Sequence, residues 1–196
     1  MAGHRERTRG QQASGAQETR EGLMFERFTT AVRNVVIGAQ QEARTSGSAE
    51  IDSTDLLVSL IRRQDETAVR LLDGHHLTVE ELTEEFDRVK RRGGLTDEEA
   101  AALSAVGVDV ENVIRSVEAS FGKNALAPAG RRKRHIPFST EAKRTLEQCL
   151  KEALSRKHKY IGSEHLLLAL LSRQSLAAQA LEAKGVTYRG ISDQVA

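Results

Sequence analysis

An internal repeat is the feature that most constrains the fold of this chain. Segments 28–71 and 138–181 align without a gap, at one constant offset in the numbering. The shared residues are mostly apolar and recur at helical spacing, so one supersecondary unit has been built twice, and we expect two similar helical halves with a common core. The matched pairs are Phe28/Phe138, Thr30/Thr140, Glu42/Glu152, Ala43/Ala153, Ile51/Ile161, Ser53/Ser163, Leu56/Leu166, Leu57/Leu167, Leu60/Leu170, Arg63/Arg173, Gln64/Gln174, Ala68/Ala178 and Leu71/Leu181.

The composition favours helix packing over a β-sandwich. Aromatic residues make up 4% of the 196 residues and tryptophan is absent, while Leu, Ala and Val carry the apolar content. The predicted fold class is therefore all-α. The formal net charge is +1, from 29 basic and 28 acidic residues, so no long-range field points to nucleic acid or to a membrane surface as a partner.

Cysteine usage and hydropathy bear on the compartment. The single cysteine, Cys149, lies between Leu146 and Leu150 in a helical pattern, so we expect a buried apolar side chain and no disulfide. No apolar run approaches the roughly 18 residues that span a bilayer, and the N-terminus lacks the apolar core of a signal peptide. These features predict a cytoplasmic protein.

Changes in composition divide the chain into four parts. We predict a disordered arm at 1–22, a first repeat at 23–89, a helical insert with a basic linker at 90–130, and a second repeat at 131–196. The basic run Arg131 to Arg134 is either a solvated loop or a docking patch. Capping residues predict helices that begin near Thr29 or Thr30, Ser53 or Thr54, Asp65, Thr78, Thr96, Asp109, Ser139 or Thr140, Ser163, Ser175 and Thr187.

Three motifs resemble a known family. Residues 24–29 (MFERFT), 135–140 (HIPFST) and 160–171 (YIGSEHLLLALL) look like the repeated N-terminal domain of Clp ATPases, closest to the ClpC type. The resemblance implies two pseudo-symmetric four-helix repeats, with the 90–130 insert outside the usual pattern. It also implies a receptor that binds protein substrates and adaptors for an unfoldase such as a ClpC-type ATPase.

A nucleotide-binding motif is absent from the sequence. No Gly-x-x-x-x-Gly-Lys-Ser/Thr loop occurs, so nothing in the chain can cradle a nucleotide's phosphates. No nucleophile, base and orienting acid stand together at motif spacing either. We therefore expect a stand-alone receptor without AAA+ modules, without enzymatic activity and without a cofactor, and we expect it to be a monomer.

The resemblance further implies pockets for phosphorylated arginine, one in each repeat. In the second repeat Ser139 and Thr140 begin the long helix, where amides suit a phosphate, and Glu164 stands where the family places its guanidinium-binding glutamate. Helix capping is the alternative role for Ser139 and Thr140, and stabilisation by the helix dipole is the alternative for Glu164.

The matching pocket of the first repeat is predicted to be degenerate. Thr29 and Thr30 are in place, but Thr54 stands at the position of Glu164 and cannot supply a countercharge. Asp52 or Asp55 is the alternative source of that charge.

Two phenylalanines form a second candidate surface. Phe25 and Phe138 open the two repeats where related actinobacterial domains expose aromatic residues that bind cyclic-peptide antibiotics and adaptors. A domain that keeps both could sequester such peptides and shield the full-length ATPase, whereas stapling of a helix start is the structural alternative. A helical regulatory protein that acts through its basic linker is a further alternative. His75 and His76 lack partners at ligand spacing, so no metal site is predicted.

Overall fold

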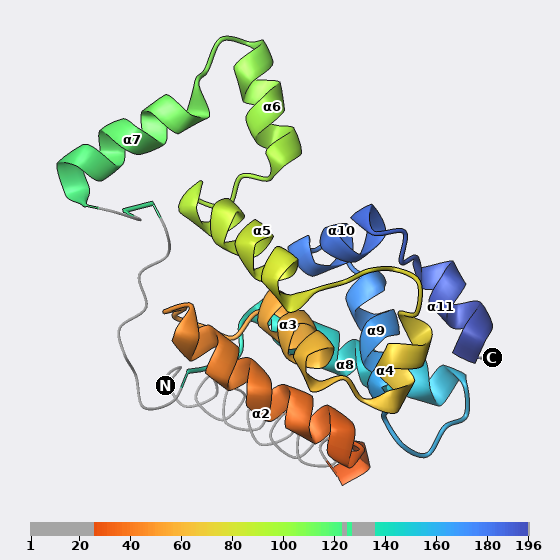
Figure 1. Cartoon of the computed structure of the whole chain (residues 1–196). Helices are drawn as coiled ribbons and strands as arrows, with labels where there is room; N and C mark the ends of the chain where they lie inside the picture. Colours follow the sequence, from red (N-terminus) through yellow and green to blue (C-terminus); the bar gives the residue numbers. More distant parts are fainter. Residues whose placement is uncertain (1–25, 123–124, 127–135, 196) are drawn as a thin grey trace, which may run out of the picture.

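The computed structural model describes residues 26–122, 125–126 and 136–195. Within these residues the regular elements are all helices, arranged as Figure 1 shows, so the predicted all-α class is confirmed. The predicted disordered arm at 1–22 and the basic run Arg131 to Arg134 lie outside the described part. The helices are α2 (Thr30–Thr45), α3 (Ser53–Arg63), α4 (Glu66–Leu71), α5 (Val79–Arg91), α6 (Asp97–Ala105), α7 (Val110–Phe121), α8 (Thr140–Ser155), α9 (Ser163–Leu171), α10 (Leu176–Ala183) and α11 (Tyr188–Val195).

The predicted repeat is present in the helices themselves. Helices α2 and α8 have the same length, and their starts are related by the offset that relates Phe28 to Phe138. The starts of α3 and α9, and of α4 and α10, are related in the same way. The long helices are capped alike, since the hydroxyl of Thr29 accepts a hydrogen bond from the amide of Val32 and that of Ser139 accepts one from Ala142. Each unit therefore begins in the same register.

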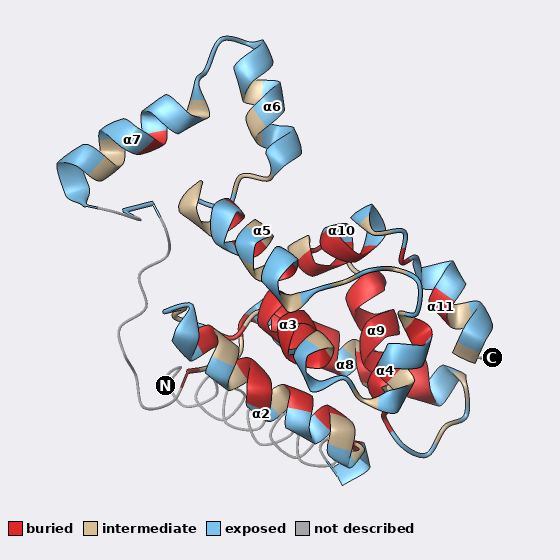
Figure 2. Ribbon diagram, viewed as in Figure 1, coloured by how far each residue is buried: buried red, intermediate tan, exposed pale blue. Residues whose placement is uncertain are grey.

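The core is built around α3 and α9. Every residue of α9 is buried, and eight of the eleven residues of α3 are buried as well (Figure 2). A helix that is apolar on all sides must be covered on all sides, and the leucines here each contribute about 1.5–3 kcal/mol by their burial. Helix α2 packs on α3 and α8 packs on α9, and the two central helices also contact each other.

Two short parallel bridges connect the halves reciprocally. Phe28 pairs with Ile161, and Ile51 pairs with Phe138. The amide of Thr29 donates to the carbonyl of Ile161 at 3.0 Å, and the amide of Ser139 donates to the carbonyl of Ile51 at 3.0 Å. The start of each long helix is thereby held against the segment that precedes the second helix of the other repeat.

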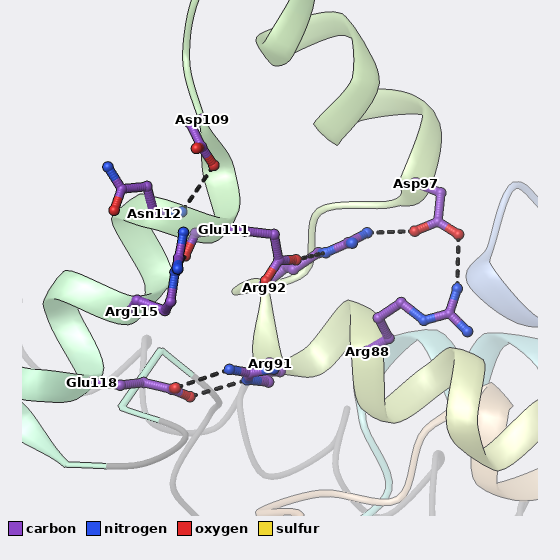
Figure 3. Close-up of polar contacts among 9 residues, drawn as sticks. All are labelled: Arg88, Arg91, Arg92, Asp97, Asp109, Glu111, Asn112, Arg115 and Glu118. Carbon is purple, nitrogen blue, oxygen red and sulfur yellow. Dashed lines mark hydrogen bonds and ion pairs between the residues drawn. The ribbon is translucent and has the colours of Figure 1, made fainter.

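Helices α6 and α7 extend away from this core (Figure 1). No residue of α6 is buried, and in α7 only Ile114 is. Three arginines near the end of α5 hold the two helices through ion pairs: Arg88 and Arg92 with Asp97, Arg92 with Glu111, and Arg91 with Glu118 (Figure 3). We call residues 96–122 the helical arm.

None of the helices in the described ranges combines the length and the apolar character needed to cross a membrane. Cys149 is buried, as its helical context predicts. Burial raises the pKa of its thiol, which keeps the group protonated.

Candidate functional site

A cleft of about 440 Å³ lies between the two repeats. The first repeat contributes the start of α2 and one side of α4 with its N-cap, and the second contributes the loop between α8 and α9, the start of α9 and the end of α11. The reciprocal bridges explain this composition, because Phe28 and Ile161 bring the start of α2 beside the start of α9. The lining residues are Thr29, Ala31, Asp65, Glu66, Thr67, Arg70, His158, Tyr160, Gly162, Ser163, Glu164, Gln194 and Val195.

The structure groups the predicted binding residues differently from the sequence interpretation. Glu164 shares the cleft with Thr29 of the first repeat. Ser139 and Thr140 do not line it, because Ser139 lies against Ile51, across the other bridge. The physical reason is that the bridges cross between the repeats, so each helix start meets the other half's segment rather than its own.

The remaining predicted residues lie elsewhere. Thr30 and Thr140 are exposed first residues of their helices, and Thr54 is buried at the start of α3 beside a smaller hollow. Phe138 is half-buried and packs against the core. Phe25 lies outside the described residues.

The carboxylate of Glu164 lies directly against the Cα of Gly162. A Cβ added at Gly162 would lie 2.3 Å from one carboxylate oxygen of Glu164, so only a glycine leaves room for the group. Burial raises the pKa of this carboxyl and the charge of Asp65 adds to the rise, while its own backbone amide and the charge of Arg70 oppose it. Among the described residues no lysine or arginine lies within ion-pair distance of it, and its charged form therefore gains from a cationic ligand.

His158 lines the cleft, and the fully buried His165 contacts it from the core side. The amide of Gly162 donates to Nδ1 of His165 at 3.0 Å, which assigns the proton of the neutral ring to Nε2, and that nitrogen lies 2.9 Å from Nδ1 of His158. Burial lowers the pKa of His165 to about 4, so the ring is neutral at physiological pH. Tyr160 stacks on His158 with ring centroids 5.4 Å apart.

His158, Glu164 and His165 also have the residue types of a metal site. One ligand atom from each lies within 4.8 Å of the others. The nitrogens of His165 are both engaged, however, and a metal on this ring would displace either the bond from Gly162 or the bond to His158. We therefore interpret these residues as a hydrogen-bonded cluster rather than as a metal site. As possible metal ligands the sequence interpretation weighed only His75 and His76, and for His165 it favoured packing or a helix-start hydrogen bond, which the bond from Gly162 supplies. It missed His158, which lies two residues before the motif at 160–171.

The start of α2 is electropositive, in contrast to the carboxylate of Glu164. The first turn of α2 contains no acidic residue, whereas the first turn of α8 contains Glu141 at the place of Ala31. The first amides of a helix have no acceptor within the helix and carry the positive end of its dipole. This end of α2 therefore faces the cleft without a neutralising carboxylate in its own first turn, while Asp65 and Glu66 lie further along the wall.

The fold and the cleft together define a duplicated, all-helical binding domain. Residues 92–184 match the family described as the Clp repeat (R) N-terminal domain. The chaperone protein ClpC1 of Oryza sativa subsp. japonica is 32% identical over 173 residues, covering 88% of this chain and 15% of that protein. A ClpA homolog of Brassica napus is also 32% identical over 173 residues, covering 88% of this chain and 16% of that protein.

The structural comparison agrees with these matches. The crystal structure of the N-terminal domain of ClpD from Arabidopsis thaliana superposes with a TM-score of 0.50 at 18% identity, covering 88% of this chain and 99% of that one. The chain belongs to the Clp N-terminal domain family. It spans about 15% of the length of the relatives that it matches, and its 196 residues contain no phosphate-binding loop of an ATPase. Domains of this family take part in binding substrates and adaptors of Clp systems.

Proposed function

We propose that this protein is a receptor for substrates or adaptors of a ClpC-type Clp system, and that its cleft holds an arginine side chain that carries a phosphate. One observation carries the proposal: the same cleft is lined by a helix start with no acidic residue in its first turn and by a carboxylate that has no lysine or arginine ion-pair partner among the described residues. A phosphate suits the amides at the start of α2, and a guanidinium suits the carboxylate of Glu164. No step of this function requires ATP hydrolysis by the chain itself.

The position related to the cleft by the repeat, between the starts of α8 and α3, is less suited to the same ligand. There the start of α8 carries Glu141, which neutralises the helix end, and Thr54 replaces the carboxylate. Asp52, at the position of Gly162, adds a further negative charge beside that helix end. We therefore propose one phosphoarginine site, composed from both repeats, in place of one in each.

Binding of cyclic peptides is an alternative to phosphoarginine binding, and it would make the protein a sequestering agent. Phe138 is half-buried against the core, and Phe25 lies outside the described residues. No described contact favours this function over the first. The regulatory role of the basic linker likewise falls on residues outside the described ranges.

Calorimetry with a phosphoarginine peptide tests the proposal. Glu164→Gln should weaken binding at least about tenfold because it removes the charge opposite the guanidinium. Ala31→Glu should weaken it comparably, since it places in α2 the carboxylate that α8 already has at Glu141.

The matched controls exploit the repeat. Glu141→Ala and Thr54→Ala alter the equivalent positions of the other site and should leave the affinity within about twofold of wild type. Equal losses from Glu164→Gln and Thr54→Ala, or no loss from Ala31→Glu, would contradict a single composite site.

A further inference from the structure

A second, smaller hollow of about 130 Å³ is lined by residues of the first repeat and by Lys90, which directly follows it. It is bounded by the end of α2, the start of α3 and the middle of α5. The hydroxyls of Thr54 and Thr83, which line it, are both buried and have no hydrogen-bond partner among the residues that the structure describes. Thr54 is 7% exposed. Because burying a hydroxyl without a hydrogen-bond partner is unfavourable, the pair indicates that this hollow accepts a polar group of a ligand.

The second repeat shows what fills the equivalent space. Its Arg156 corresponds to Ser46 at the offset of the repeat, and both directly follow the long helix. One terminal nitrogen of Arg156 donates to the carboxylate of Glu152 at 2.6 Å, and the other donates to the hydroxyl of Ser192 at 2.9 Å. Because Glu152 is buried, this is a built-in guanidinium site, occupied by the chain's own side chain.

The acceptors of that site have counterparts in the first repeat. Glu42 corresponds to Glu152 in the alignment of the repeats. Helix α5 begins at Val79 and helix α11 at Tyr188, so Thr83 and Ser192 are each the fifth residue of their helix and correspond to each other. The hydroxyl without a partner is thus the one whose equivalent accepts a hydrogen bond from Arg156.

The first repeat has no arginine at the position of Arg156. Ser46 is too short to reach across, and the amine of Lys90 donates instead to the hydroxyls of Ser48 at 3.1 Å and Ser46 at 3.5 Å. Glu42 is paired with Arg62 at 2.8 Å. Asp55 replaces the neutral His165 of the second repeat, so the hollow contains an additional carboxyl group.

The charges around the hollow favour a cation. The acids Glu42, Asp55 and Asp87 face the bases Arg62 and Lys90. Since Glu42 and Arg62 neutralise each other, two carboxyl groups remain against one amine. Burial is the main reason that the pKa of Asp55 rises to about 6, and a bound cation would offset that cost by stabilising the ionised form.

We propose that this hollow binds the guanidinium head of an arginine side chain from a protein partner, in the place that Arg156 occupies in the second repeat. The site is separate from the cleft, because neither Glu164 nor the start of α2 lines it. Its success or failure is therefore independent of the function proposed above.

Titration of the ¹⁵N-labelled chain with N-acetyl-arginine methylamide, followed by NMR, tests the site. The amides of Thr54, Asp55, Thr83 and Lys90 should shift together with one dissociation constant. The citrulline derivative has nearly the same shape without the charge, and it should bind at least about tenfold more weakly.

Two reciprocal variants use the repeat as its own control. Ser46→Arg places the side chain of the second repeat in the hollow, so it should abolish these shifts and raise Tm. Arg156→Ser opens the equivalent space around Glu152 and Ser192, and it should create a second set of shifts there on addition of the arginine derivative.

Thr83→Val removes one acceptor at nearly constant volume and should weaken binding about fivefold; it decides the question if Ser46→Arg does not fold. The proposal is overturned if citrulline binds as well as arginine, if the shifts scatter over the surface, or if they persist in a folded Ser46→Arg variant or remain unchanged in Thr83→Val.

Discussion

At the scale of single residues, two sequence differences between the repeats determine where we propose that a guanidinium binds. Gly162 leaves room for the carboxylate of Glu164, and its backbone φ of −102° is one that any residue adopts, so close approach rather than backbone strain requires the glycine. The first repeat has Asp52 and Thr54 at these positions. The loss of the glutamate could be predicted from the sequence, but the closeness of Gly162 and Glu164 could not, because it depends on the side-chain conformation.

Asp55 makes stability depend on pH in an unusual direction. Burial raises its pKa from 3.8 to about 6, so the folded state binds this proton more tightly than the unfolded state does. Its contribution to stability is fully present below pH 3.8 and is lost as the pH rises through 6. Asp55→Asn retains an oxygen that can accept from the amide of Asp52, which now lies 2.8 Å from the carboxylate, and it removes the buried charge.

We expect Asp55→Asn to raise the free energy of unfolding by about 1–2 kcal/mol at pH 7.5 and by much less near pH 4.5. Urea denaturation followed by circular dichroism at the two pH values measures this. An equal change at both would show that the carboxyl group does not titrate differently in the folded state.

At the scale of elements, helix starts were the most predictable feature. Thr78, Thr96, Asp109 and Ser175 each accept a hydrogen bond from an amide three residues on, as their capping patterns predict. Capping is a local interaction within one turn, so it is visible in sequence. The contact between Arg156 and Ser192 joins helices that are separated by the whole of α9 and α10, and no local pattern signals it.

The attachment of the helical arm to α5 should depend on salt. Each of its ion pairs has at least one solvent-exposed partner, such as Asp97 at 61% and Glu111 at 49%, while Arg92 and Glu118 are 16% and 13% exposed. The helical arm shares little apolar surface with the core. Exposed pairs contribute about 0–1 kcal/mol each and are screened by added salt. Raising NaCl from about 0.1 M to about 1 M should therefore increase hydrogen exchange of amides in 97–121 but leave α9 protected.

Arg92→Gln removes the contacts to both Asp97 and Glu111 and should reproduce this effect at low salt. Exchange in the helical arm that is unaffected by both salt and this substitution would mean that apolar contacts, such as those of the buried Ile114, hold it instead.

At the scale of the whole molecule, the two halves are duplicates, and each bridge joins a segment of one half to a segment of the other. The constant offset between the aligned segments predicts two equivalent helical units, and the helix boundaries confirm it. The offset cannot predict which unit completes which site, because that depends on the bridges Phe28 to Ile161 and Ile51 to Phe138. The proposed site in the cleft needs residues of both repeats, which is a consequence of tertiary structure rather than of either repeat's own sequence.

An NMR titration with a phosphoarginine peptide tests this composite site most directly. We predict that the amides of residues 30–32 in the first repeat and 162–164 in the second shift together with one dissociation constant, while those of 140–142 do not move. An unphosphorylated arginine peptide should leave 30–32 unshifted. Joint shifts of 140–142 and 162–164, with 30–32 unaffected, would contradict a site shared between the repeats.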